Sequence, residues 1–300
     1  MTQRLGLDRL ARPSGGFAML AIDQREALRG MLAVASGAEV GSVSDQQIID
    51  FKLSAARHLS PHASAVLMDV EWAAEPILAD GCLGADTAMI IAADRLIGPT
   101  GGAAAQSEFD ETIDMAEWRS KGASAFKLLI FWDPIQPGDH ESTTALFVES
   151  CHKVGAPAVV EIIVRSSAPA DESHFDRDIV SAAKWVADLD PDLYKAQMPG
   201  RGATTADQAS MIARCKDISE AVRCPWVILS NGVRSEDFSN AVLAACRGGA
   251  SGFLAGRAIW ADAIASGSYE TRLPSESVPR LRMLSALVDE HCRPWQRPPE

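Results

Sequence analysis

Two lysines lie inside apolar, strand-like runs of the sequence, where an ammonium group is costly to bury. Lys127 lies within residues 125–132, and Lys195 lies within residues 193–199. Desolvation or a neighbouring cation favours the neutral amine of a lysine, and a neutral amine attacks a carbonyl carbon to form a Schiff base. The alternative for Lys195 is a structural lysine that reaches water at a strand end or pairs with a buried acid. The other lysines lie in polar, helix-like segments, where we expect a solvated surface role: Lys52, Lys121, Lys153, Lys184 and Lys216.

An acid lies in the apolar run between those two lysines. Glu161 is in the middle of residues 158–164. If the three runs are neighbouring strands and the three side chains point inward, they are separated by strand spacings of roughly 5 Å each. A purely structural role is disfavoured, because replacing buried charges with packed apolar residues often leaves the stability of a protein unchanged or increases it. Such clusters are typical of active sites, so we predict Lys195 as the nucleophile, Lys127 as a second cation and Glu161 as a proton carrier.

Eight apolar runs alternate with helix-like stretches along the chain. Their hydrophobicity is continuous, which is typical of parallel strands covered on both faces. The runs are residues 17–23, 63–69, 88–93, 125–132, 158–164, 193–199, 226–230 and 252–257. Eight strand–helix units predict a single domain over residues 1–300, an α/β fold of the (β/α)8 TIM-barrel type, with an open doubly wound sheet as the alternative. We expect residues 1–16 as a lead-in, residues 293–300 as a Pro-rich tail and residues 94–107 as a loop.

Polar residues follow several of these strands, and a barrel gathers the carboxyl ends of its strands at one face. Asp23 and Asp69 follow the first two strands, where each is either catalytic or a cap of the next helix. A second set follows the last two strands: Ser230, Asn231, Gly232, Gly256 and Arg257. Barrels often bind a phosphate there through loop N–H groups and a helix N-terminus, and Arg257 would add a fork of donors. The alternative is that the glycines only make tight turns.

Composition excludes several classes of protein. The net charge of −12 argues against a nucleic-acid partner, since phosphate neutralisation needs a basic face. No run approaches the roughly 20 apolar residues of a membrane span, and the first residues do not resemble a secretory signal. Six scattered cysteines predict free thiols in a reducing cytoplasm. The histidines are scattered too, so a histidine-built metal centre is disfavoured.

Five stretches of the chain match a known group of enzymes: residues 14–29, 60–67, 192–195, 225–230 and 249–258. Through them the sequence resembles the class I, Schiff-base aldolases of the tagatose-bisphosphate aldolase group. Within that group it is most similar to the bacterial 6-deoxy-6-sulfofructose-1-phosphate aldolases of sulfoquinovose breakdown. The match spans nearly the whole chain, and its first and last stretches are long and specific.

The resemblance implies a barrel with its Schiff-base lysine at Lys195, a second lysine at Lys127 and an acid at Glu161. It also implies a substrate phosphate near four residues: Ser230, Gly232, Gly256 and Arg257. Three residues match family positions near the mouth, where we predict that they hold the far anionic end of the substrate: Gln24, Arg25 and Arg165. Relatives are homo-oligomers, so we expect a homodimer or homotetramer.

The resemblance predicts a lyase that cleaves 6-deoxy-6-sulfofructose 1-phosphate to dihydroxyacetone phosphate and 3-sulfolactaldehyde, with no metal or other cofactor. Glu161 or Asp23 would take the C4 hydroxyl proton. The alternatives are cleavage of tagatose or fructose 1,6-bisphosphate, a metal-dependent aldolase, and a sugar-phosphate-binding barrel with weakened catalysis. Gln197 favours the last of these, because relatives usually have an acid there. Asn231 and Asp133 are further departures, from a serine and a basic residue respectively.

Overall fold

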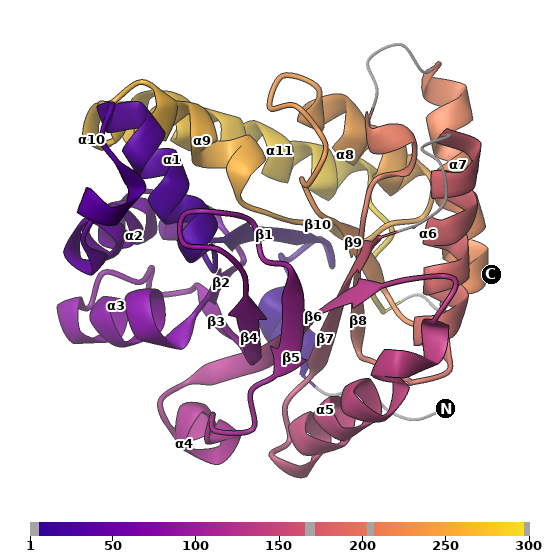
Figure 1. Ribbon diagram of the computed structural model, residues 1–300. Helices are drawn as coiled ribbons and strands as arrows, with labels where there is room; N and C mark the ends of the chain where they lie inside the picture. The colour runs from indigo at the N-terminus through magenta and orange to yellow at the C-terminus, as the bar shows by residue number, and fades with distance from the viewer. Residues whose placement is uncertain (1–5, 166–171, 203–206, 297–300) are drawn as a thin grey trace.

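The computed structural model describes residues 6–165, 172–202 and 207–296, so the first residues of the lead-in (1–5) and the end of the tail (297–300) lie outside the described residues. Eight parallel strands form a closed barrel in the order β1-β10-β9-β8-β7-β6-β3-β2 (Figure 1). They are β1 (Phe17–Ala21), β2 (Ala65–Met68), β3 (Ala88–Ala92), β6 (Ala123–Trp132), β7 (Ala158–Val164), β8 (Leu193–Ala196), β9 (Trp226–Ile228) and β10 (Gly252–Ala255). Each predicted apolar run forms one of these strands, which confirms the (β/α)8 barrel.

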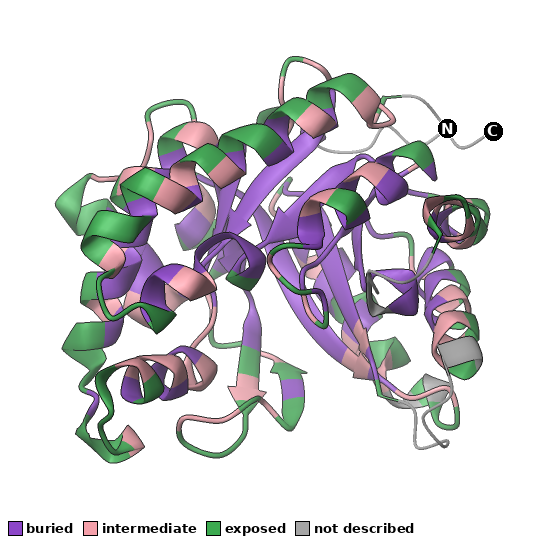
Figure 2. Cartoon of the chain, turned by 90° about the horizontal axis from the view of Figure 1, so that it is seen from above, coloured by how far each residue is buried: buried purple, intermediate pink, exposed green. Residues whose placement is uncertain are grey.

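Helices surround the barrel, with their exposed residues on the outside and the buried strands within (Figure 2). The α-helices are α1 (Glu26–Ser36), α2 (Asp45–Leu59), α3 (Glu75–Asp80), α4 (Met115–Ser120), α5 (Glu141–Lys153), α6 (Glu172–Ala187), α7 (Gln208–Ala221), α8 (Phe238–Arg247), α9 (Arg257–Ala265), α10 (Tyr269–Arg272) and α11 (Val278–His291). Short 3-10 or π turns are η1 (Leu7–Leu10), η2 (Val40–Ser42), η3 (Ser60–His62), η4 (Val70–Ala74), η5 (Pro137–His140), η6 (Pro199–Gly202) and η7 (Leu273–Ser277).

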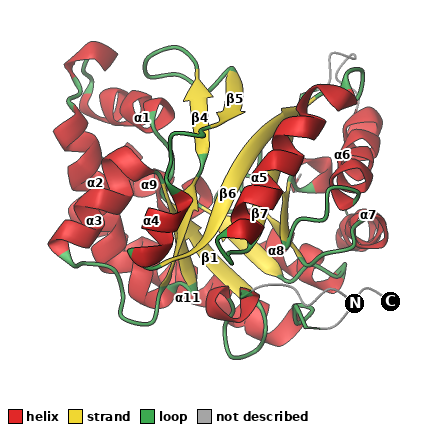
Figure 3. Cartoon of the chain, turned by 90° about the horizontal axis from the view of Figure 1, so that it is seen from below, coloured by secondary structure: helices red, strands yellow, loops and turns green. Residues whose placement is uncertain are grey.

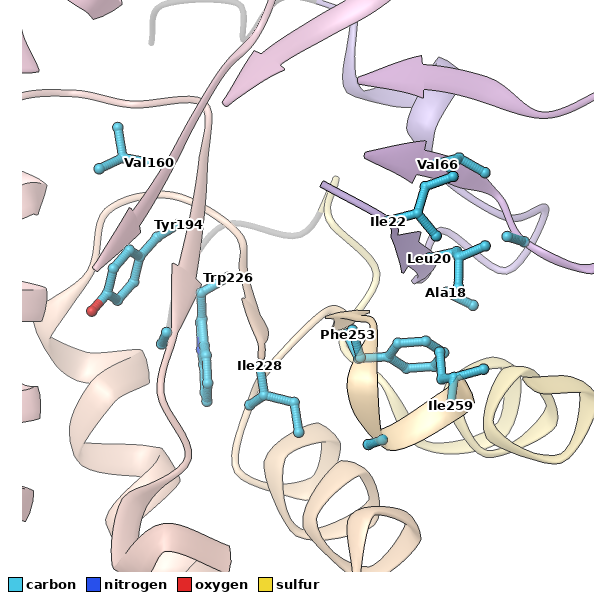
Figure 4. Close-up of a cluster of buried hydrophobic side chains, with 14 of the residues drawn as sticks. Ala18, Leu20, Ile22, Val66, Val160, Tyr194, Trp226, Ile228, Phe253 and Ile259 are labelled. Carbon is cyan, nitrogen blue, oxygen red and sulfur yellow. The ribbon is translucent and has the colours of Figure 1, made fainter. Parts of the chain in front are cut away.

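Alternate residues of each strand belong to two separate apolar layers, because successive side chains of a strand point to opposite faces. Leu20 and Ile22 belong to the outer layer that packs against the helices, part of which is drawn in Figure 4. Met19 of β1, Ala125 of β6 and Leu193 of β8 belong to the layer inside the barrel. Leu7 and Leu10 of η1 join the inner layer, so the lead-in contributes to the barrel core.

An antiparallel hairpin interrupts the repeat between β3 and β6. It consists of β4 (Asp94–Ile97) and β5 (Gln106–Phe109), which stand apart from the barrel strands in Figure 3. The prediction of a loop over residues 94–107 is therefore wrong. The two strands have four residues each, of which half are exposed, so they lack an apolar run, while the glycines and proline of residues 98–102 mark only the tip.

The tip of the hairpin rests on α1. The backbone N–H of Gly101 donates to Glu26 Oε2 at 2.8 Å. A Cβ atom added to Gly30 would lie only 2.0 Å from the carbonyl oxygen of Gly101, so the two segments approach this closely because Gly30 has no side chain. The hairpin is thus fixed to the helix that follows β1.

Candidate active site

Lys195 points into the barrel from β8. It is two residues beyond Leu193 of the inner layer, so its side chain shares that face of the strand. Lys195 is directly opposite Glu161 of β7 in the strand register. Its Nζ lies 2.8 Å from Glu161 Oε2, and the residue is 4% exposed. The predicted nucleophile and the predicted acid therefore form one buried ion pair.

Lys127 of β6 lies at the centre of a cluster of carboxylates. Its Nζ is 2.8 Å from Asp23 Oδ2, 2.8 Å from Asp94 Oδ2 and 3.2 Å from Glu161 Oε2. The residue is 1% exposed. Because Glu161 Oε2 contacts both lysines, the four residues predicted as catalytic are brought together: Lys195, Glu161, Lys127 and Asp23.

Electrostatics fix the charges of this cluster. Burial raises the pKa of Asp23, but the ammonium groups of Lys127 and Lys195 outweigh it, and the pKa lies below its ordinary value. Burial raises the pKa of Glu161 in the same way, and the same two lysines again bring it below its ordinary value. Burial lowers the pKa of Lys127, but three carboxylates raise it well above the ordinary value. Near neutral pH, Asp23 and Glu161 are therefore carboxylates and Lys127 is an ammonium group.

Asp94 is a member of the cluster that the sequence analysis missed. It is the first residue of β4, and its Oδ2 accepts hydrogen bonds from Lys127 Nζ and from the backbone N–H of Leu129 at 3.1 Å. The glycines and the proline of residues 98–102 predict a loop for the whole segment, and a loop prediction assigns no role to Asp94. The available signal was an acid directly after an apolar run, the same signal that identified Asp23.

Two arginines predicted to bind substrate are bound to the hairpin. Arg25 donates to the carbonyl oxygen of Asp94 at 2.7 Å and to Asp94 Oδ1 at 3.3 Å. Arg165 donates to the carbonyl oxygens of Ala104 and Ala105, and its guanidinium carbon lies 3.5 Å from the centroid of the Phe131 ring. Burial lowers the pKa of Arg165. Both guanidinium groups thus connect the hairpin to the carboxyl ends of barrel strands.

The predicted phosphate residues follow the paired strands β9 and β10. Arg257 Nη2 donates to Asn231 Oδ1 at 2.6 Å, so the two loops are bound to each other. Gly256 precedes α9 as its N-cap, and Gly232 has a φ of 83°, which favours glycine. Ser230 is buried at the end of the strand. The set combines a helix N-terminus with a guanidinium group, as an anion site requires.

Gln24 connects this set to the carboxylate cluster. Its Nε2 donates to Asp23 Oδ1 at 3.3 Å, and its Oε1 is buried without a hydrogen-bond partner. A Cβ atom added to Gly256 would lie 2.5 Å from the carbonyl oxygen of Ala21 and 3.0 Å from Gln24 Nε2. The free Oε1 is an acceptor that a hydroxyl group of a bound molecule could use.

Lys52 is a further buried lysine, and its predicted surface role is wrong. It lies on α2 with 0% exposure and forms an ion pair with Asp69 Oδ2. Asp69 Oδ1 accepts a hydrogen bond from the N–H of Trp72 at 2.8 Å, so Asp69 caps the turn that follows β2. Burial lowers the pKa of Lys52 despite its partner. Lys52 points from its helix to a strand end, a contact between two elements that its own segment of sequence does not indicate.

Gln197 and a pocket beside the hairpin lie at the carboxyl ends of the barrel strands. Gln197 Oε1 accepts a hydrogen bond from the backbone N–H of Val164 at 2.7 Å, so its carbonyl joins the loop after β8 to the end of β7. A pocket of about 660 Å³ lies between the hairpin, β6 and α5. Its lining includes Glu108, Glu111, Phe131, Asp133, His140 and Arg165. Carboxylates therefore lie beside Arg165 in this pocket, and we call Glu108, Glu111 and Asp133 the acidic rim.

The part of the chain that the structure describes contains neither a cluster of metal ligands nor a helix that could span a membrane. Among residues 6–165, 172–202 and 207–296, no group of three or more His, Cys, Asp or Glu side chains is placed to hold a metal ion. Within the same residues, every helix is too short or too polar to span a bilayer.

Most of the chain matches one known protein family. Residues 17–262 match the family described as DeoC/LacD family aldolase. The chain is 27% identical to the tagatose 1,6-diphosphate aldolase of Listeria monocytogenes serotype 4b (strain CLIP80459), over 97% of this chain and 92% of that protein.

Solved structures support the fold. The chain is similar to a fructose-bisphosphate aldolase from Plasmodium falciparum, with a TM-score of 0.69 at 14% identity, over 96% of this chain and 94% of that one. It is also similar to an archaeal fructose-1,6-bisphosphate aldolase whose catalytic lysine is covalently bound to the carbinolamine intermediate of the substrate. That match has a TM-score of 0.62 at 18% identity, over 95% of this chain and 98% of that one. At these identities the likeness establishes the barrel fold alone.

Proposed function

The chain belongs to the DeoC/LacD family of aldolases, and on that premise we propose that it cleaves a ketose 1-phosphate through a Schiff base on Lys195. Aldolases are carbon–carbon lyases, so the chain is an enzyme of that class. The observation that carries the proposal is the contact of 2.8 Å between Lys195 Nζ and Glu161 Oε2 inside the barrel. It gives a buried amine a proton acceptor at hydrogen-bond distance, as covalent catalysis by an amine requires.

The first step forms the Schiff base. Glu161 takes a proton from the Lys195 ammonium group, and the free amine attacks the C2 ketone to give a carbinolamine. The protonated Glu161 returns its proton to the carbinolamine hydroxyl, which leaves as water, and the C2–N bond becomes an iminium. Lys127 stays protonated throughout, since three carboxylates raise its pKa.

The second step breaks the C3–C4 bond. Asp23 or Glu161, both carboxylates near neutral pH, removes the C4 hydroxyl proton. The electrons of the broken bond move into the iminium, which becomes an enamine, and the aldehyde leaves. The same acid returns its proton to C3 of the enamine, and water then hydrolyses the iminium to free dihydroxyacetone phosphate and regenerate Lys195.

Phosphate binding aligns the substrate for these steps. We assign the C1 phosphate to the ends of β9 and β10, where Ser230, Gly232 and Gly256 offer loop N–H groups and Arg257 offers a guanidinium group. Gln24 Oε1, buried and unpartnered, is an acceptor for a substrate hydroxyl. Binding energy from the phosphate then orients C2 towards Lys195.

We propose 6-deoxy-6-sulfofructose 1-phosphate as the substrate, with 3-sulfolactaldehyde as the second product. Asp133, Glu108 and Glu111 of the acidic rim disfavour a phosphate at the far end of the substrate more than they disfavour a sulfonate. A sulfonate carries one negative charge, whereas a phosphate monoester carries about 1.5 to 2 at pH 7, so these carboxylates repel the sulfonate less. The name of the Listeria relative favours a second candidate, tagatose 1,6-bisphosphate, and fructose 1,6-bisphosphate is its close analogue.

A borohydride trap tests the Schiff base. The protein is incubated with dihydroxyacetone phosphate and borohydride, and peptide mapping locates the added mass. We expect the adduct on Lys195, its loss in Lys195→Arg, and its retention in Lys216→Arg, a control at an exposed lysine. No adduct, or an adduct elsewhere, would reject the mechanism, and activity abolished by EDTA would indicate the metal-dependent alternative.

A turnover panel tests the substrate. The three candidate sugars are compared by kcat/KM, and we expect the sulfosugar to exceed both bisphosphates. Faster cleavage of a bisphosphate would reject the sulfosugar assignment while leaving the Schiff base intact. Binding of all three without turnover would indicate the sugar-phosphate-binding barrel instead. We also propose that the chain acts in the cytoplasm and that it forms a homodimer or homotetramer. Light scattering of the purified protein tests the oligomeric state.

A further inference from the structure

Asp94 is held more firmly than any step of the proposed reaction requires. Its side chain is 0% exposed, and both carboxylate oxygens are bound. Oδ2 accepts from Lys127 Nζ at 2.8 Å and from the Leu129 N–H at 3.1 Å, while Oδ1 accepts from Arg25 Nη2 at 3.3 Å. A carboxylate bound on both oxygens by three donors, two from β6 and one from Arg25, is held against rotation, so it is a fixed reference point for the Lys127 ammonium group.

The charges around Lys127 balance only when Asp94 is included. Its ammonium group is faced by Asp23 after β1, by Asp94 of the hairpin and by Glu161 of β7. The other two cations are Lys195, bound to Glu161, and Arg25, bound to Asp94. Three cations thus meet three carboxylates. Glu161 serves both lysines, whereas Asp94 binds Lys127 and Arg25.

We propose that Asp94 is a positioning residue that keeps Lys127 a permanent, oriented ammonium group, so that Glu161 alone exchanges a proton with Lys195. This inference rests on the proposed function. A second acid or base at Lys127 would compete for the Glu161 proton, since the two groups lie 3.2 Å apart. With Lys127 held charged by three carboxylates, Glu161 exchanges a proton with Lys195 and not with Lys127.

A double-mutant cycle in turnover tests the inference. We expect Asp94→Asn to lower kcat roughly 10- to 100-fold, the range for outer partners that orient a catalytic group, and to change KM less than about threefold. If Asp94 acts through Lys127, adding Asp94→Asn to Lys127→Gln lowers kcat by less than about threefold more. A double variant that loses the product of the two single effects would overturn the inference.

The matched control is Asp192→Asn. Asp192 is also a buried carboxylate that accepts a backbone N–H, from Ala158 at 2.9 Å, but it precedes β8 at the opposite end of the barrel. We expect its effect on kcat to be small and to multiply with that of Lys127→Gln. A loss of kcat as large as that of Asp94→Asn would assign both effects to a missing buried carboxylate and overturn the inference.

The pH dependence of kcat provides a second test that leaves Lys127 unchanged, in case its variants do not fold. Removing one of three carboxylates lowers the pKa of Lys127, so Asp94→Asn should lose activity at a lower alkaline pH than the wild type does. An unchanged alkaline profile would overturn the inference. The borohydride trap separates the two hypotheses: if the wild type forms no Lys195 adduct, the proposed function fails, and if it does, only the role of Asp94 is under test.

Discussion

Two buried lysines, Lys127 and Lys52, show what distinguishes a reactive cluster from a structural pair. Both have almost no exposed surface and both contact aspartate. Lys127 points into the barrel and meets three carboxylates, which raise its pKa well above the ordinary value. Lys52 extends from α2 to the end of β2 and meets one carboxylate, and burial lowers its pKa.

The difference lies in how the acceptor is shared. Asp69 is saturated, since Oδ2 binds Lys52 and Oδ1 binds the Trp72 N–H, so the pair only joins α2 to the turn after β2. Glu161 Oε2 is instead shared between Lys127 and Lys195. Glu161 can therefore exchange a proton with Lys195 while it stays in contact with the charged Lys127, whereas the Lys52–Asp69 pair only holds two elements together. Burial and an acidic partner are therefore insufficient to identify a catalytic lysine.

The largest expected effect is on activity, at the shared oxygen. Glu161→Gln keeps the shape but removes the proton acceptor of Lys195, so we expect kcat to fall about 10²- to 10⁴-fold, the contribution typical of a general base. Steady-state kinetics with the best substrate measures it. Asp69→Asn is the matched variant at the other cluster, and its folded fraction should retain wild-type kcat. Equal losses in both variants would erase the distinction between the two clusters.

The next effect is on stability, at the saturated pair. Lys52→Met leaves the Asp69 carboxylate buried without its cation, and we expect the free energy of unfolding to fall by about 3–5 kcal/mol. Urea unfolding monitored by tryptophan fluorescence measures the change. A loss of kcat in the folded variant, in place of a loss of stability, would show that Lys52 belongs to the reaction.

The two regions should also respond to pH, each in a different range. Asp23 and Glu161 have folded pKa values below their unfolded ones, so their stabilisation is present above about pH 4 and is lost as the pH falls through the folded values. Lys52 has a folded pKa below its unfolded value of 10.5, so it opposes folding at neutral pH, and this penalty shrinks as the pH rises towards 10.5.

Urea unfolding as a function of pH measures both responses. We expect Asp23→Asn to flatten the acid limb of stability and Lys52→Met to flatten any rise on the alkaline side. An acid limb that is unchanged in Asp23→Asn would contradict the ionised state that we assign to the cluster. The change of stability with pH should be smaller than the change caused by Lys52→Met, because a change of pH alters the charge of groups that remain in place.

The sequence predicted the parts of this molecule that depend on continuous hydrophobicity. Each barrel strand is an apolar run, and a charged residue inside such a run, as at Lys127, Glu161 or Lys195, is visible against it. Asp94 was missed because it begins a short, exposed hairpin strand whose turn residues resemble a loop. Lys52 was misplaced because its burial depends on the distance between α2 and β2, which is set by tertiary packing and not by its neighbours in the chain.

The smallest effect concerns the helix that carries Lys52, and it separates support of the fold from chemistry. Ser44 caps α2 in a reciprocal arrangement: its Oγ accepts from the Gln47 N–H, and Gln47 Oε1 accepts from the Ser44 N–H at 2.9 Å. Ser44→Ala removes one half of it, so we expect a loss of about 1 kcal/mol in the free energy of unfolding and no change in kcat. The cap and Lys52 stabilise the same helix, but the two residues lie eight positions apart and share no contact among those described. The losses in unfolding free energy from Ser44→Ala and Lys52→Met should therefore add. A drop in kcat from Ser44→Ala alone would mean that the position of α2 is transmitted through Asp69 to the carboxyl ends of the strands, and the two lysine regions would then be one coupled unit.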